Sequence, residues 1–428
     1  MNGRMKGDNW HVRDRFGMII HWGLYSIPAR GEWVRSAERI PHAEYRGYMD
    51  EFAAPRFDAA EWAKAAKRAG MRYAILTAKH HDGFCLFDSG LTDFKSTNTP
   101  LGRDVVAEYV EAFRNEGLKV GLYYSLIDWR HPAYPVKGDR HHPMRHDPSE
   151  YEREPFESYL EYLHGQIREL CANYGKIDLF WFDFSYDEMK GLKWGADRIM
   201  DILDELQPDA LVNNRMEASG EGMGSIASDS PTRWSGDFVT PEQLLPPEGL
   251  RGVSGEPVHW EACVTMNDGW GYSASDFNYK SPALIVRKVV ECVSKGGNIV
   301  VNMGPDATGA VPDECARTLA AVGDWMSANG EGVYGCGSAG IAKPEWGRYT
   351  RKGDVLYAHV FEPPIGALPL TGIERERIKG VRLLCDGTEI PICDDWTTGN
   401  YPGVTFVKVW PYKKFNEADT VLKIELKR

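Results

Sequence analysis

Seven strand-length apolar runs, separated by longer and more polar stretches, constrain the fold of this chain more than any other feature. Because each run is apolar at nearly every position, it suits a parallel strand that is covered on both faces. Amphipathic segments of helical period lie between many of the runs, and most of these segments end on glycine, as helices commonly do. The apolar runs lie at 16–22, 73–79, 119–125, 177–183, 210–215, 259–264 and 298–304.

Alternation of strands and helices over this length predicts either a (β/α)8 barrel or a doubly wound parallel sheet. No GxGxxG follows the first run, which disfavours a dinucleotide-binding sheet. The segment 216–258 is rich in Gly, Ser, Pro and acidic residues, and its best candidate for an eighth strand is "TRWSGDF" at 232–238. No helix is evident between the fifth and sixth runs. We therefore expect an α/β fold, an irregular (β/α)8 (TIM-like) barrel.

The pattern changes after a further helix that we expect at about 312–329. Short apolar runs separated by turn residues predict a C-terminal antiparallel β-sandwich. The change falls within "NGEGVYGCGS" at 329–338, so we expect a catalytic barrel over residues 1–335 and a β-sandwich domain over residues 336–428. The expected strands of the sandwich lie at 354–361, 378–387, 404–410 and 420–427.

Composition and charge disfavour two classes of partner. The formal net charge is −12 and no tract of Lys or Arg is present, which argues against nucleic acid. No apolar run approaches the about 20 residues of a membrane span, and the start of the sequence lacks the apolar core of a signal peptide. The 8 cysteines are scattered without a CxxC pair, as expected of thiols in a reducing compartment. We expect a cytoplasmic protein for the sequence as given, and a homo-oligomer is compatible with it.

Polar and aromatic residues follow most of the predicted strands. In a (β/α)8 barrel the carboxyl ends of the strands meet at one rim, where the catalytic groups lie. Strands that all end in such residues therefore indicate a binding or catalytic site. These residues are His21, Trp22, His80, His81, Asp82, Tyr124, Trp181, Asp183, Asp187, Asn214, Arg215, Asp237, Glu242, Trp260, Glu261 and Asn302.

Three chemistries compete for this rim. A metal site could use the three histidines with Asp183, but adjacent residues on a strand point to opposite sides, so His80 and His81 share a metal only after a bend. Neither HxH nor HExxH is present. Nucleophilic serine chemistry is disfavoured because the chain contains no GxSxG elbow, and cysteine chemistry is disfavoured because the cysteines lie in apolar surroundings.

Paired carboxylates are the third possibility and the one we favour. Asp183 ends "LFWFD", where a carboxylate is costly unless the site pairs or uses it. A second carboxylate from 237–261 could act as general acid. A separation of about 5–5.5 Å would give a retaining glycosidase, and about 6.5–9.5 Å an inverting one. The 14 Trp and 20 Tyr are consistent with a sugar ligand, although bulky core residues would explain them equally well.

Six ordered motifs resemble those of the alpha-L-fucosidases of glycoside hydrolase family 29. They cover residues 10–335 in collinear order, and a β-sandwich follows them as in that family. The motifs are "FGMIIHWGLYSIPARGEW", "TAKHHDGFCLFDS", "GLYYSLIDW", "LFWFD", "WEACVTMNDGWGY" and "SKGGNIVVNMGPDATGAVPDE".

The resemblance implies a retaining, exo-acting hydrolase that removes terminal alpha-linked L-fucose from oligosaccharides or glycoconjugates, without a cofactor or a metal. It implies Asp183 as nucleophile, Glu242 as first choice for the acid/base and Glu261 as the alternative. One departure is Phe184, where the family often has glycine after the nucleophile; it leaves open a catalytically silent or differently specific carbohydrate-binding barrel. The residues that match the sugar pocket are His21, Glu32, Trp33, His80, His81, Tyr124, Trp181, Arg215 and Trp270.

Overall fold

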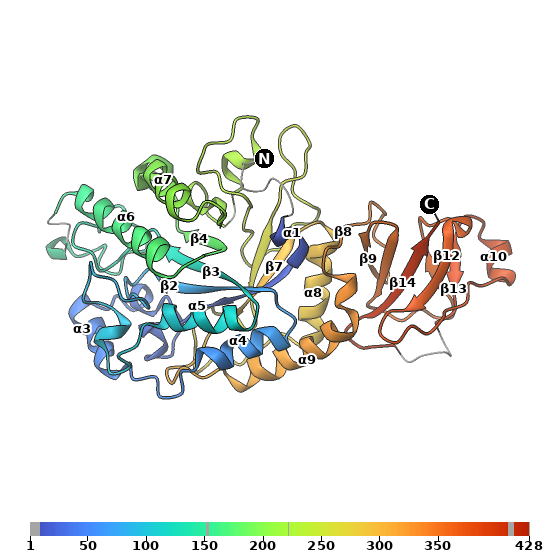
Figure 1. The fold of residues 1–428 in the computed structure, drawn as a ribbon, viewed down its shortest axis with the longest axis horizontal. Coiled ribbons are helices and arrows are strands. Elements are labelled where there is room, and N and C mark those ends of the chain that lie inside the picture. Colours follow the sequence, from blue (N-terminus) through green and yellow to red (C-terminus); the bar gives the residue numbers. More distant parts are fainter. Residues whose placement is uncertain (1–8, 151–153, 221, 410–414, 428) are drawn as a thin grey trace.

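A computed structural model describes residues 9–150, 154–220, 222–409 and 415–427. It consists of a large α/β part and a smaller antiparallel β part that lies beyond α8 and α9 (Figure 1). The helices are α1 (Trp10–Asp14), α2 (Val34–Ala37), α3 (His42–Arg46), α4 (Ala59–Arg68), α5 (Val105–Asn115), α6 (Phe156–Asn173), α7 (Ala196–Leu206), α8 (Pro282–Ser294), α9 (Asp313–Asn329) and α10 (Trp396–Asn400). The strands of the large part are β1 (Phe16–Ile20), β2 (Tyr73–Lys79), β3 (Lys119–Ser125), β4 (Leu179–Asp183), β5 (Leu211–Val212), β6 (Glu261–Thr265) and β7 (Asn298–Met303).

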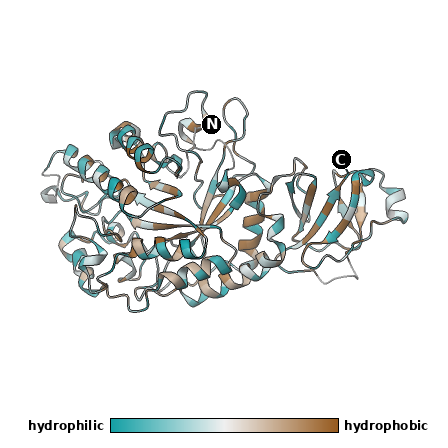
Figure 2. Ribbon diagram, in the orientation of Figure 1, coloured by the Kyte–Doolittle hydropathy of each residue, from teal (hydrophilic) through white to brown (hydrophobic). Residues whose placement is uncertain are grey.

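The seven predicted parallel strands are confirmed, and they form one sheet in the order β5-β4-β3-β2-β1-β7-β6. β1, the first strand, lies inside the sheet between β2 and β7, with Gly17 opposite both Tyr73 and Val300. Nearly every residue of these strands is buried, which explains why the runs are apolar throughout (Figure 2).

The prediction of an eighth strand at 232–238 is wrong. The structure assigns no strand to the described residues between β5 and β6; the chain from 237 to 243 instead makes single backbone hydrogen bonds to both neighbours. The amide of Asn214 donates to Phe238 (3.0 Å), and the amide of Val239 donates to His259 (2.9 Å). An irregular segment rich in turn residues therefore spans the interval between β5 and β6, so that the sheet curls into an irregular barrel. Of the same described residues, none lies in an α-helix, as the sequence predicts.

Side-chain caps fix the starts of α4 and α5, two of the helices that cover the sheet. The carboxylate of Asp58 accepts from the Ala60 amide at the start of α4 (2.8 Å), and that of Asp104 accepts from the Ala107 amide at the start of α5 (2.9 Å). Such a cap satisfies an amide that the helix leaves without a partner. The helix α7, between β4 and β5, is an element that the sequence patterns did not reveal.

The C-terminal part is a small antiparallel sandwich, as predicted, with more strands than the sequence indicated. A five-stranded sheet in the order β12-β14-β10-β9-β8 faces the pair β11-β13 across a core of its own. Arg287 of α8 donates to the carbonyls of Phe361, Glu417 and Ala418, all at 2.9 Å, and so joins the two parts. Residue 410, the end of one predicted strand, lies outside the described residues. The strands are β8 (Gly337–Ser338), β9 (Gly347–Lys352), β10 (Val355–Val360), β11 (Leu368–Leu370), β12 (Ile378–Leu383), β13 (Thr405–Val407) and β14 (Thr420–Leu426).

No helix in the described part of the chain is both long and apolar enough to cross a membrane.

Candidate active site

A pocket opens at the carboxyl ends of the parallel strands, the end at which barrels and doubly wound sheets bind their ligands. The pocket is small, with a cavity volume of about 50 Å³. The predicted catalytic and sugar-binding residues all line this pocket except Tyr124 and Glu261. The lining residues are Ile19, His21, Glu32, Trp33, His80, His81, Tyr123, Trp181, Asp183, Phe184, Arg215, Glu242, Cys263 and Trp270.

Asp183 is the last residue of β4, and its side chain is 11% exposed. It accepts three hydrogen bonds, from the Tyr123 hydroxyl to Oδ2 (2.6 Å), from Arg215 Nη1 to Oδ1 (2.8 Å) and from the Phe184 amide to Oδ1 (2.8 Å). Burial of a carboxylate is costly unless it is paired or hydrogen-bonded, and these donors compensate that cost. Oδ2 accepts only one of the three bonds and is the less occupied oxygen.

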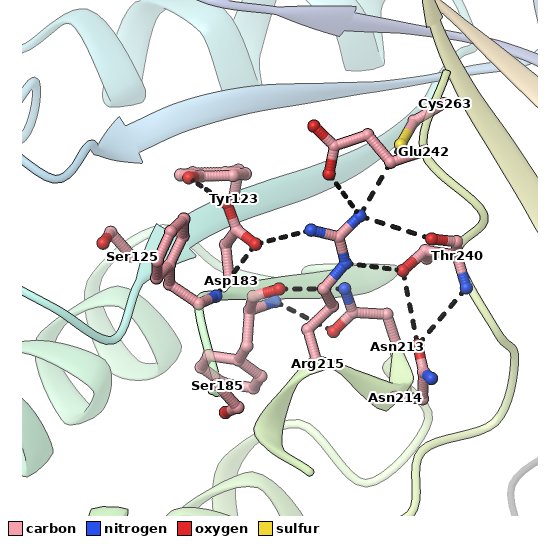
Figure 3. A network of polar contacts seen from close by, with 12 residues as sticks. Tyr123, Ser125, Asp183, Ser185, Asn213, Asn214, Arg215, Thr240, Glu242 and Cys263 are labelled. Carbon is pink, nitrogen blue, oxygen red and sulfur yellow. Dashed lines mark hydrogen bonds and ion pairs between the residues drawn. The ribbon is translucent and has the colours of Figure 1, made fainter. Parts of the chain in front are cut away.

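One guanidinium joins two carboxylates in this pocket (Figure 3). Arg215 donates from Nη1 to Asp183 and from Nη2 to Glu242 Oε2 (2.9 Å), while its Nε donates to the Thr240 hydroxyl (2.8 Å). Burial acts to lower the pKa of Arg215, but the charges of Asp183 and Glu242 outweigh it and raise the pKa above its ordinary value. The guanidinium therefore remains charged and holds the two acids on either side of it.

His21 presents a hydrogen-bond acceptor to the pocket. The side-chain amide of Asn302 donates to the Trp270 carbonyl (2.6 Å), so its oxygen accepts from His21 Nδ1 (2.8 Å). The proton of the neutral ring then resides on Nδ1, which leaves a lone pair on Nε2. Burial lowers the pKa of His21 to about 4, so the ring is neutral at physiological pH.

His81 is held in the same tautomer by a different partner. Ser125 Oγ donates to the Ile127 carbonyl (2.9 Å) and accepts from His81 Nδ1 (2.7 Å), so Nε2 again carries the lone pair. Burial, together with the neighbouring His21, lowers the pKa of His81 well below its ordinary value. His81 Nε2 lies 3.8 Å from Asp183 Oδ2, where a ligand hydroxyl that donates to either acceptor would fit.

Two further pocket residues carry polar atoms that the described residues do not satisfy. His80 Nδ1 and Trp181 Nε1 are both buried without a hydrogen-bond partner in that part of the chain. A buried polar group without a partner is costly, so its persistence at a polar pocket indicates a ligand that supplies the partner. Because β2 ends at Lys79, both histidines lie beyond the strand, where its alternation no longer applies, and both line the pocket.

Glu32 adds a further buried carboxyl group to the lining of the pocket. Its Oε2 accepts from the Gly271 amide (2.7 Å), and burial raises its pKa. The described residues contain no group of three or more His, Cys, Asp and Glu side chains arranged to hold a metal ion. Acceptors, donors and aromatic rings around a small volume are what a polyhydroxylated ring requires.

Comparison with known proteins assigns the chain to a family. The family model described as Alpha-L-fucosidase matches residues 2–331. The chain belongs to the alpha-L-fucosidase family. The resemblance seen in the ordered sequence motifs is thereby confirmed.

Individual members of the family are similar over nearly the whole chain. Alpha-L-fucosidase isoenzyme 1 from Paenibacillus thiaminolyticus is 51% identical with a TM-score of 0.95, over 100% of this chain and 99% of that one. A trapped covalent intermediate of a family 29 alpha-L-fucosidase from Bacteroides thetaiotaomicron, in complex with 2-fluoro-fucosyl fluoride, is 32% identical with a TM-score of 0.83, over 97% and 95% of the two chains. The human tissue alpha-L-fucosidase is 28% identical over 384 residues, which are 82% of this chain and 74% of that one.

The prediction of Tyr124 as a pocket residue is wrong, and its neighbour Tyr123 takes that place. The Tyr124 hydroxyl donates to Gln166 on α6 (2.8 Å), on the opposite face of the sheet. Tyr123 pairs laterally with Trp181 in the parallel register and shares its face. Adjacent strand residues alternate in direction, so only one tyrosine of "YYS" can reach the pocket, and the register with β4 is the signal that identifies it.

Glu261 is also excluded from the pocket, because it begins β6 rather than ending it. It pairs with Asn298, whereas Thr265 pairs with Asn302, the residue that holds His21. Cys263, two residues further along β6, lines the pocket, so Glu261 lies about 7 Å below it. Its carboxylate is fully buried and accepts from His11 Nε2 (2.7 Å) and from the Tyr73 hydroxyl.

Proposed function

We propose that this chain is a retaining alpha-L-fucosidase in which Asp183 is the nucleophile and Glu242 the acid/base. The observation that carries the proposal is the pair of carboxylates on one guanidinium, in a pocket that offers acceptors for sugar hydroxyls. Family membership restricts the substrate class to alpha-L-fucosides, and a relative has been trapped as a covalent intermediate. We expect the substrate to be a fucosylated oligosaccharide or glycoconjugate.

In the first step Asp183 Oδ2, the less occupied oxygen, attacks the anomeric carbon of the bound fucose. The bond from this carbon to the leaving oxygen breaks, and Glu242 transfers its proton to that oxygen. Because Glu242 Oε2 accepts from Arg215, the proton resides on Oε1. In the second step Glu242 removes a proton from water, which attacks the same carbon and releases Asp183.

The pocket orients the sugar through the polar atoms described above. Ring hydroxyls donate to the lone pairs on Nε2 of His21 and His81 and accept from Trp181 Nε1. Apolar surface from Ile19 and Trp270 suits the methyl group that distinguishes fucose from galactose. A site built to pair with particular hydroxyls discriminates strongly against sugars that lack them.

The proposal is tested by release of p-nitrophenol from its alpha-L-fucoside beside the alpha- and beta-galactosides. We expect turnover of the fucoside alone. Asp183→Ala should reduce kcat by several orders of magnitude, and azide should restore turnover in Glu242→Ala. Near-normal activity of the Asp183 variant, or equal turnover of a galactoside, would contradict the proposal; tight fucose binding without any turnover would favour the catalytically silent protein.

A further inference from the structure

The exposure of the pocket residues shows where the group attached to the fucose must leave the pocket. Most of the residues that line the pocket are no more than 8% exposed. Four lining residues are only partly buried or exposed: Trp33, Phe184, Glu242 and Trp270. These four form the mouth. Because the proposed acid protonates the leaving oxygen, the leaving group lies at this mouth, which three aromatic residues share with Glu242.

Two of the mouth residues belong to a cluster of three aromatic rings that continues beyond the pocket. The Trp33 ring lies 5.2 Å from that of His141 and 5.7 Å from that of Phe184, and the last two are 5.4 Å apart. The rings come from the segments after β1, β3 and β4. All three are only partly buried, so a ligand can reach them.

The backbone conformation of Phe184 indicates that its phenyl ring has a function. Its φ is +80°, in the left-handed region that is strained for a side chain and free for glycine. The Phe184 amide donates to Asp183, and a glycine would adopt the same backbone conformation without strain. The phenyl ring therefore contributes something that offsets the strain, and it lies against His81, Trp33 and His141.

A buried carboxylate holds two of the segments together. Asp139 is 4% exposed and accepts from the His141 amide (2.7 Å), from Tyr134 (3.1 Å) and from Trp129 Nε1 (3.2 Å). It also accepts from the hydroxyl of Tyr186, two residues after Phe184. The loop after β3 and the loop after β4 are thereby fixed to each other, and the arrangement of rings is preformed.

His141 adds a polar group to this surface. Arg140 Nε donates to His141 Nε2 (3.2 Å), so the proton of the neutral ring resides on Nδ1. The surface thus combines aromatic faces with one hydrogen-bond donor. This combination suits a ring with an apolar face and hydroxyls at its edge.

We propose that Trp33, His141 and Phe184 bind the group attached to the fucose, and that they favour a ring with an apolar face, either a second sugar or an aryl group. The proposal rests on the proposed fucosidase activity and adds its leaving-group specificity. Asp139 acts in it as a positioning residue.

The test compares substrates that differ only in the leaving group. Alpha-L-fucosyl fluoride has no ring to bind, whereas p-nitrophenyl alpha-L-fucoside carries an aryl ring and a fucosyl disaccharide carries a sugar. Phe184→Gly keeps the backbone conformation and removes the ring, and His141→Ala removes a ring that does not adjoin the nucleophile. In both ring variants we expect kcat/KM to fall about tenfold for a ring-bearing substrate, mainly through KM, and in His141→Ala we expect it to change less than about threefold for the fluoride. Asp139→Asn should show the same selective loss. The control is Trp396→Ala, which removes a 71% exposed ring from the C-terminal part.

The results distinguish the fucosidase proposal from the inference about the leaving group. No turnover of the fluoride by the unaltered protein would reject the fucosidase proposal itself. If the fluoride is turned over, an equal loss for all three substrates in both ring variants would overturn the inference, and so would no loss for any of them. A loss confined to the aryl fucoside or to the disaccharide would support it and identify the ring that binds.

Discussion

Replacement of Arg215 by methionine should destabilise the protein through the charge that it leaves behind at Asp183. Arg215 is 3% exposed and the Asp183 side chain 11% exposed, so their ion pair at 2.8 Å is shielded from water. Removal of one partner of such a pair costs about 3–5 kcal/mol of the free energy of unfolding. The Glu242 side chain is 37% exposed, so its own lost contact adds at most about 1 kcal/mol.

If the uncompensated charge is the cause, neutralising Asp183 should reverse most of the loss. We expect Arg215→Met/Asp183→Asn to recover at least about 2 kcal/mol relative to Arg215→Met alone, a coupling that a double-mutant cycle measures. Urea unfolding followed by tryptophan fluorescence provides the midpoints, with Asp183→Asn as the fourth corner of the cycle. A midpoint of Arg215→Met close to that of the unaltered protein, or an additive double variant, would refute this explanation.

Three further predictions follow from the placement of single residues. Tyr124→Phe should leave kcat/KM within about twofold and cost about 1 kcal/mol of the free energy of unfolding, whereas Tyr123→Phe should change kcat/KM by more than this. A larger change of kcat/KM in Tyr124→Phe than in Tyr123→Phe would contradict the register of β3 against β4. Glu261→Gln should keep most of its activity and show no rescue by azide, and rescue would return this residue to the role of acid. Because the pKa of His21 falls from 6.5 to about 4 on folding, the unfolded chain binds a proton first as the pH decreases between these values. As the pH falls from 6.5 to about 4, His21 should therefore lower the free energy of unfolding by about 1.4 kcal/mol per pH unit, and its full contribution is present above pH 6.5. Urea midpoints measured at several pH values should fall less steeply with decreasing pH in His21→Gln than in the unaltered protein.

The local pattern of apolar residues was sufficient to locate the strands, because a parallel strand covered on both faces must be apolar along its length. The run "LFWFD" identified both β4 and the acid at its end, since a carboxylate after four apolar residues is tolerated only where something pairs with it. Amphipathic segments that end on glycine likewise indicated helices between the strands, among them α4 and α5.

Residues whose role depends on pairing between distant strands could not be placed in this way. "YYS" offers two equivalent tyrosines, and only the register of β3 against β4 selects Tyr123. Glu261 was assigned to the end of a strand that it in fact begins, and only the pairing of β6 with β7 corrects this. The support of the pocket histidines by Ser125 and Asn302 likewise joins residues that are 44 and 281 positions apart.

The sequence by itself therefore determined the seven parallel strands in their order along the chain, the family, and most residue types that surround the pocket, because these depend on hydrophobic period and on short ordered motifs. Only the tertiary structure decided which carboxylate accompanies Asp183. Glu242 reaches it through Arg215 from a segment with no regular secondary structure, whose position is set by hydrogen bonds to β5 and β6 rather than by any period of its own. It also decided that Phe184 adopts a left-handed backbone beside Trp33 and His141, since that contact arises from three loops that converge only when the sheet has curled.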